Sequence, residues 1–132
     1  MRADITRGDE KGFNPFGDLI GLRFVEVKPG YSRCALQVHE GLLNPNGTLH
    51  GGVVYTLADT GMGAAVFAAL QEGKSCATIE IKISYFRAVR EGELRCETRV
   101  VHRGRRMAFV ESEVHNRGRL VAKATGTFAI FD

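Results

Sequence analysis

The sequence has little of what several classes of protein require. Its three cysteines, Cys34, Cys76 and Cys96, form no C-x-x-C pair, so a disulfide framework or zinc site is not expected and a reducing cytoplasm fits best. Its four histidines lack H-x-x-x-H spacing and have no nearby carboxylate in a ligand pattern, so no metal site is predicted. The net charge of +3 is too weak to indicate nucleic-acid binding.

Signals for export or membrane insertion are also missing. The first eleven residues carry too many charges for a signal peptide. The longest apolar stretch, residues 51–70, is rich in glycine and alanine and is interrupted by Asp59, so it is a poor membrane span. We expect a cytoplasmic protein with no membrane association, in which residues 1–12 are flexible and residues 13–132 form one domain.

The most informative segment is residues 44–59, where a polar, glycine-rich turn runs into a long apolar helix. Between Gly51 and Leu70 there is no Lys, Arg or Glu, and a helix that is apolar on all sides is usually buried. Asp59 has no Lys or Arg three or four residues away to pair with. Burying an unpaired carboxylate is costly and often raises its pKa. A raised pKa is what a general base or nucleophile near neutral pH requires. The alternative is a buried Asp satisfied by an amide or hydroxyl of another element.

Two glycines, Gly51 and Gly52, follow His50 where the helix is expected to begin. The first N–H groups of a helix have no intrahelical partner and favour negative charge, which suits an oxyanion. Asp59 follows Gly51 by eight residues, about 12 Å along a helix, which is too far for both to reach one carbonyl carbon. Either the site combines Gly51 of one subunit with Asp59 of another, or the glycines only allow a turn to pack tightly against a sheet.

Hydrophobic periodicity and turn residues predict a short helix, a strand pair, a long helix and four more strands. The expected ranges are 15–20, 22–27, 31–38, 51–70, 78–85, 94–102, 107–114 and 120–131. Short turns between strands favour one antiparallel sheet with the long helix on one face. Alternation in the strand 78–85 places Ile79, Ile81 and Ile83 toward the core and Thr78 on the other face. Dimerisation through a sheet edge would cover that edge.

The segment Leu43–Gly52 fits the pattern N-x-x-G-x-x-H-G-G and is followed by Asp59 in the helix. With further matches at residues 81–86, 90–93, 103–108 and 125–128, the chain resembles the hotdog-fold acyl-CoA thioesterases of the PaaI (phenylacetate-pathway) type over residues 15–130. The resemblance implies an α+β fold in which a six-stranded antiparallel sheet wraps around one long central helix. It also implies a homodimer with joined sheets, often paired into a tetramer, and active sites at the dimer interface.

The resemblance assigns roles to five residues. Asp59 would be the general base or nucleophile, and the Gly51 N–H would polarise the thioester carbonyl. Asn44 would help to place the substrate or the water, His50 would orient the loop and contact the thioester region, and Thr78 would orient the water. CoA is then part of the substrate, and no separate cofactor is expected.

Basic residues cluster between positions 87 and 106, where seven arginines occur. They form either a solvated strand face with a basic turn, or a patch for a phosphate-bearing ligand. Together with the resemblance, the second interpretation makes five of them candidates to hold the phosphates of CoA: Arg87, Arg90, Arg103, Arg105 and Arg106.

Two other functions stay open. A dehydratase or hydratase on the same fold would pair a His with an acidic residue. A non-catalytic acyl-CoA-binding module is the second, although sensors of this kind usually carry a DNA-binding segment and only about a dozen residues precede the expected fold. The resemblance favours aromatic acyl groups such as phenylacetyl, while aliphatic chains or a benzoyl intermediate remain alternatives. The candidate pocket residues Phe16, Tyr55, Met62 and Phe67 are apolar and do not discriminate.

Overall fold

The structure is a computed structural model that describes residues 12–132. Of the segment 1–12 that is expected to be flexible, all but Gly12 lies outside the described residues. Within residues 12–132, two helices, a short 3-10 turn and six strands follow one another. They are α1 (Pro15–Ile20), β1 (Leu22–Lys28), β2 (Tyr31–Gln37), η2 (Glu40–Leu42), α2 (Gly51–Ala68), β3 (Ser75–Tyr85), β4 (Glu93–Arg103), β5 (Met107–Asn116) and β6 (Arg119–Phe131).

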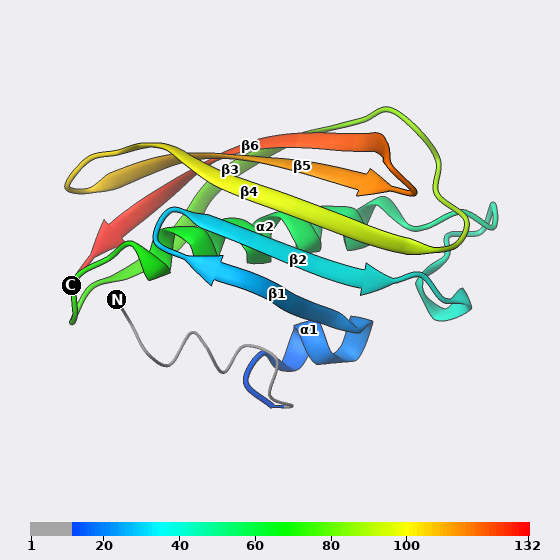
Figure 1. Cartoon of the computed structure of the whole chain (residues 1–132), viewed down its shortest axis with the longest axis horizontal. Helices are drawn as coiled ribbons and strands as arrows, with labels where there is room; N and C mark the ends of the chain where they lie inside the picture. Colours follow the sequence, from blue (N-terminus) through cyan, green and yellow to red (C-terminus); the bar gives the residue numbers. More distant parts are fainter. Residues whose placement is uncertain (1–11) are drawn as a thin grey trace.

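The six strands form one antiparallel sheet in the order β1-β2-β4-β5-β6-β3. This sheet curves around α2, which lies in its concave face (Figure 1). The predicted α+β arrangement is therefore confirmed, and β1 and β3 are its two edges. At one end of the molecule the start of α2 lies near the β3–β4 connection, and at the other end its last turn lies near the β4–β5 hairpin (Figure 1).

Small residues in the middle of α2 let the helix lie close to the sheet. A Cβ at Gly61 would stand 3.0 Å from Thr98 Oγ1 and 3.2 Å from Ser32 Oγ. The Ser32 hydroxyl donates a hydrogen bond of 2.6 Å to the Gly61 carbonyl oxygen. Thr98 and Ser112 share a second buried hydroxyl pair of 2.7 Å beneath the helix. Because each hydroxyl has a partner, burying this polar strip costs little.

The opposite face of α2 is not covered, so the expected burial on all sides is wrong for the single chain. The sheet reaches only one side of the helix, which leaves an apolar stripe at helical spacing open to the outside. Gly52 and Tyr55 are exposed. Six further residues of this stripe are half-buried: Val53, Thr56, Asp59, Thr60, Gly63 and Phe67.

A β-bulge changes the expected alternation in β3. Thr78 pairs with Phe128 and Glu80 pairs with Thr127, so Ile79 is an extra residue on the edge strand. Ile79 is 55% exposed instead of lying in the core, which corrects the prediction for this residue. Because the extra residue inverts the alternation, Thr78 joins Ile81 and Ile83 on the side that faces α2. The expected placement of Thr78 on the other face is therefore also wrong.

Candidate active site

The carboxylate of Asp59 lies at the uncovered side of α2 with a partner from β3. Thr78 Oγ1 donates a 2.7 Å hydrogen bond to Asp59 Oδ1. The side chain is half-buried, so the prediction of a fully buried carboxylate is wrong for the single chain. A hydroxyl of another element satisfies it, which is the alternative interpretation of this residue. Cys76 is close by on the same strand, where burial and then the charge of Asp59 raise the pKa of its thiol. The bulge at Ile79 is what brings Thr78 to this position.

The first turn of α2 is capped by a histidine side chain. His50 Nδ1 accepts a 2.8 Å hydrogen bond from the Gly52 N–H. The neutral imidazole therefore carries its proton on Nε2, which is free to donate. The Gly51 N–H has no acceptor among residues 12–132, so this amide remains an available donor at the helix start.

The side chain of Asn44 organises the loop before the helix. Its Oδ1 accepts from the N–H groups of Asn46 and Thr48, at 2.9 and 3.2 Å, and its Nδ2 donates to Thr48 Oγ1 at 2.9 Å. Asn44 N–H also donates to the Thr48 carbonyl oxygen at 2.7 Å. These bonds give Asn44 a role in shaping the turn; its contact with a substrate or water stays a prediction.

Tyr85 is a site residue that sequence reasoning missed. Its hydroxyl donates a 2.7 Å hydrogen bond to the Gly51 carbonyl oxygen. A Cβ at Gly51 would stand 3.2 Å from the Tyr85 ring, so glycine avoids a tight contact there. Burial first, and then Tyr55, raise the pKa of Tyr85, which keeps its hydroxyl a donor at neutral pH. The signal was present, because alternation after Ile81 and Ile83 places Tyr85 on the helix side.

Two hollows flank these residues. The Gly51 hollow, of about 380 Å³, extends from the start of α2 to the end of β3, and it is lined by Leu49, Gly51, Val54, Tyr85, Phe86, Arg87, Ala88, Val89, Val121 and Ala122. The Phe67 groove, of about 360 Å³, runs along the open side of α2 beyond Asp59, and it is lined by Phe13, Asn14, Phe24, Thr60, Gly63, Ala64, Phe67 and Cys76. Of the predicted pocket residues, Phe67 lines a hollow, whereas Met62 is fully buried in the core.

The five predicted site residues therefore form two groups in one chain. Gly51 and His50 stand at the helix start with the loop around Asn44. Asp59 and Thr78 stand two turns further along the helix, about 12 Å away. Each group is tied to the edge strand β3 by a hydrogen bond, one through Tyr85 and the other through Thr78.

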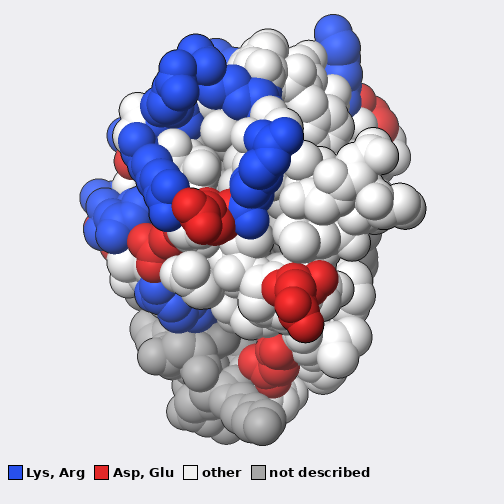
Figure 2. Space-filling model, turned by 90° about the vertical axis from the view of Figure 1, so that its right-hand side faces the viewer, with Lys and Arg blue, Asp and Glu red and all other residues white. Residues whose placement is uncertain are grey.

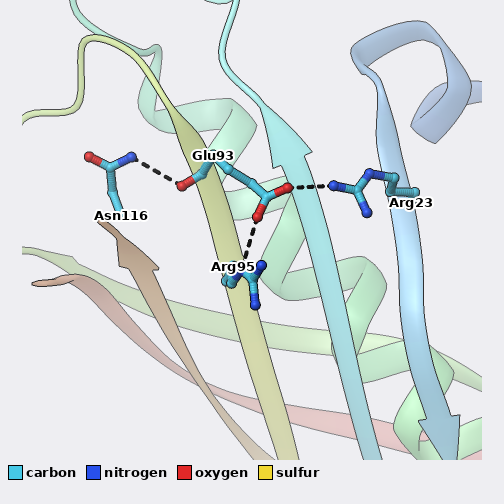
Figure 3. Close-up of polar contacts among 4 residues, drawn as sticks. All are labelled: Arg23, Glu93, Arg95 and Asn116. Carbon is cyan, nitrogen blue, oxygen red and sulfur yellow. Dashed lines mark hydrogen bonds and ion pairs between the residues drawn. The ribbon is translucent and has the colours of Figure 1, made fainter. Parts of the chain in front are cut away.

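The arginines of residues 87–106 also separate. Arg95 and Arg99 pair with glutamates on the outer sheet face, Arg95 with Glu93 at 2.8 Å and Arg99 with Glu97 at 3.5 Å. Glu93 pairs in addition with Arg23 of β1 (Figure 3). The remaining five do not form one patch in the chain. Arg87 and Arg90 lie in the β3–β4 connection, and Arg103, Arg105 and Arg106 lie at the opposite end of β4.

Two negative findings concern the described part of the chain. Across residues 12–132, no three His, Cys, Asp or Glu side chains gather closely enough to hold a metal ion. In the same residues, no helix combines the length and hydrophobicity needed to cross a membrane.

Comparison with known proteins identifies the family. Residues 46–123 match the model of the thioesterase superfamily. A curated relative from Pseudomonas aeruginosa, whose name proposes an esterase without a substrate, is 38% identical over 117 residues, which is 87% of each chain.

Solved structures agree with this match. A conserved protein from Pseudomonas aeruginosa is 40% identical, with a TM-score of 0.86 over 89% of this chain and 94% of its own. A variant of the phenylacetic acid degradation protein PaaI from Thermus thermophilus is 30% identical, with a TM-score of 0.82 over 88% and 98%. A thioesterase from Haemophilus influenzae, 20% identical, shares the fold with a TM-score of 0.92 over 100% and 93%. The chain therefore belongs to the thioesterase superfamily and is a hydrolase with the hotdog fold.

Proposed function

We propose that this protein hydrolyses the thioester of an acyl-CoA to a free acid and CoA, at sites shared between two subunits. One observation carries the proposal. The donor amide of Gly51 and the carboxylate of Asp59 are anchored to opposite ends of the same edge strand, by Tyr85 and by Thr78. Two copies that pair through β3 bring the complementary halves together, whereas one copy keeps them about 12 Å apart.

The chemistry follows from the two halves. The thioester oxygen lies at the start of α2, where the Gly51 N–H and the Nε2–H of His50 stabilise the negative charge that develops on it. Asp59 of the partner subunit, held by its own Thr78, either takes a proton from the attacking water or attacks the carbonyl carbon itself. The first route releases acid and CoA directly, and the second passes through an anhydride that water then hydrolyses.

One pairing register satisfies this geometry. On β3 the residues that face the helix are Thr78, Ile81, Ile83 and Tyr85, with Ile79 as the extra residue. If Thr78 lies opposite Tyr85 of the partner subunit, Ile81 lies opposite the partner's Ile83. Lys82 then lies opposite the partner's Lys82 on the two-fold axis. Directly opposite side chains in such a pair have Cβ atoms about 4.5–5.5 Å apart, so the two anchors become neighbours. The repulsion between the lysines is offset by Glu80, which lies diagonally across.

This register predicts a disulfide at one position. Lys82→Cys, in a chain with Cys76→Ser, is expected to form a covalent dimer under mild oxidation, because opposed strand residues meet disulfide geometry. Cys34 and Cys96 do not compete, since both are fully buried and burial raises the pKa of Cys96 to about 11 and that of Cys34 further. Non-reducing electrophoresis measures the dimer fraction.

Lys123→Cys in the same background is the matched control. Lys123 is an exposed lysine on β6, one strand away from the edge, and it pairs with Ser84 of β3. The Lys123→Cys variant should stay monomeric on the gel. Equal cross-linking of both variants, or none with Lys82→Cys, would contradict the register. Whether two such dimers join into a tetramer is a separate proposal, which light scattering tests.

The acyl group is proposed to be aromatic or of medium chain length. Supporting this, the Phe67 groove next to Asp59 is apolar, with Phe24 and Phe67 in its walls. The test is release of free thiol from a panel of acyl-CoA thioesters that includes phenylacetyl-, benzoyl- and straight-chain aliphatic groups. We expect turnover that needs no added cofactor and is unaffected by EDTA. Absence of thiol release from every member would refute the proposed activity.

The hydratase alternative is disfavoured by the imidazole of His50. Its Nδ1 is occupied by the Gly52 N–H, so the neutral ring offers a donor and no free base to the substrate. Incubation with an enoyl-CoA should therefore leave the double bond intact while the thioester is cleaved. Binding of acyl-CoA without release of thiol would instead favour the non-catalytic module.

A further inference from the structure

Another hollow, separate from the Phe67 groove, adjoins the Gly51 hollow and is lined by three arginines. This arginine pocket, of about 380 Å³, is formed by Phe86, Arg87, Ala88, Arg90, Asn116, Arg119 and Val121. It lies where the β3–β4 connection meets the turn between β5 and β6, at the same end of the molecule as the start of α2 (Figure 1). Lys and Arg side chains crowd one side of this end of the molecule (Figure 2).

The three arginines differ from their neighbours in having no carboxylate partner. Among the described residues, Arg87, Arg90 and Arg119 make no ion pair. Arg117, two residues before Arg119, pairs with Glu91 at 3.2 Å. Three unpaired guanidinium groups around one hollow repel each other, and a multiply charged anion relieves this repulsion through charge-assisted hydrogen bonds.

The backbone around the pocket is held in place by several hydrogen bonds. Phe86 N–H donates to the Val121 carbonyl oxygen at 2.8 Å, and Leu49 N–H donates to the Val89 carbonyl oxygen at 2.7 Å. Asn116 Nδ2 donates to the carbonyl oxygens of Glu91 and Glu93, each at 3.1 Å. The segment that carries Arg87 and Arg90 is therefore anchored on both sides, so little ordering is required when an anion binds.

The arginine pocket and the Gly51 hollow are adjacent. Phe86, Arg87, Ala88 and Val121 line both of them, so the three arginines stand beside the hollow that contains the Gly51 amide. We infer that the arginine pocket binds the phosphate groups of CoA, with Arg119 as an anchor beside Arg87 and Arg90, in the subunit that supplies Gly51. This inference rests on the proposed function, and it assigns the nucleotide part of the substrate to one end of the fold.

The other predicted arginines have a different setting. Arg105 and Arg106 line a hollow of about 460 Å³ at the far end of β4. That hollow also contains Asp132, whose carboxylate pairs with Lys74 at 2.7 Å. Within one subunit, this hollow lies at the opposite end of the fold from Gly51. It also already contains the Asp132 carboxylate as an anion. Arg105 and Arg106 of the same subunit are therefore not part of the phosphate site.

The experiment compares Arg119→Gln with Arg117→Gln, two variants that lose the same charge in the same β5–β6 hairpin. Each is assayed on an acyl-CoA and on the N-acetylcysteamine thioester of the same acyl group, which lacks phosphates. Arg119→Gln should raise KM for acyl-CoA about 10-fold with kcat unchanged, and should leave kcat/KM for the truncated thioester unchanged. Arg119→Lys should recover part of the loss, and Arg117→Gln should match the wild type on both substrates.

Three results would overturn the inference. These are equal KM values for both variants on acyl-CoA, an equal loss on the truncated thioester, or an effect with Arg105→Gln and Arg106→Gln in place of Arg119→Gln. Calorimetric binding of free CoA and of pantetheine separates this inference from the proposed activity. If the wild type releases no thiol but Arg119→Gln still weakens CoA about 10-fold without affecting pantetheine, the phosphate site stands and the hydrolysis proposal fails.

Discussion

Asp59→Asn is expected to lower kcat/KM for the best acyl-CoA by about 10²–10⁴-fold, because asparagine can neither accept a proton from water nor attack the thioester. The fold should persist. Asp59 is only half-buried, and an amide oxygen can still accept the hydrogen bond from Thr78. Thiol release measures the loss, and thermal melting shows whether the variant is folded.

The matched control is Thr78→Val, which keeps the shape of the side chain and removes the hydroxyl that holds the carboxylate. Loss of one such hydrogen bond should cost about 10-fold or less in turnover. Wild-type activity in Asp59→Asn would exclude this carboxylate from the reaction. A collapse of the melting temperature in Asp59→Asn would mean that the lost activity reports folding and not chemistry.

Two inactive variants should restore activity when they share a dimer. Gly51→Val places a side chain against the Tyr85 ring, where even a Cβ stands at 3.2 Å, so it displaces the Tyr85 hydroxyl and covers the amide. Combined with a subunit that carries Asp59→Asn, it leaves one of the two shared sites intact. Heterodimers purified through two different tags should therefore show about half of the wild-type activity.

The arrangement of the two changes provides the control. A heterodimer of one wild-type subunit and one subunit carrying both changes contains the same substitutions, but both shared sites are then broken, so it should be inactive. The opposite outcome, with activity when both changes lie in one subunit and none when they are separated, would place the whole site within a single chain.

The local elements were predictable because periodicity and caps act over a few residues. The sequence places the long helix at residues 51–70 and the structure has it at Gly51–Ala68 with His50 as its cap. The strand expected at 78–85 begins earlier, at Ser75, because β6 extends far enough to pair with it. Local reasoning could not detect the bulge at Ile79, since an extra residue is defined only by the register against β6.

Most residues of the candidate site could be predicted from the sequence, but their contacts could be predicted only in part. The stretch from Asn44 to Asp59 already named the donor amide, the cap and the carboxylate. Tyr85 and Arg119 were missed. Tyr85 lies 34 residues from its partner Gly51, and Arg119 reaches the pocket from a different turn than Arg87. No spacing rule connects residues so distant in sequence.

The order of the elements and the amide at the helix start can be read from local patterns in the chain. So can the separation of about 12 Å between that amide and Asp59, because helix rise is the same in any context. Which side chains meet depends on how the elements pack. The pairing of β3 with β6 turned Thr78 toward Asp59 and left the other edge of β3 unpaired, and the packing of α2 on the sheet brought Tyr85 to Gly51. These contacts depend on register and layer packing, which are set by the whole sheet and not by neighbouring residues.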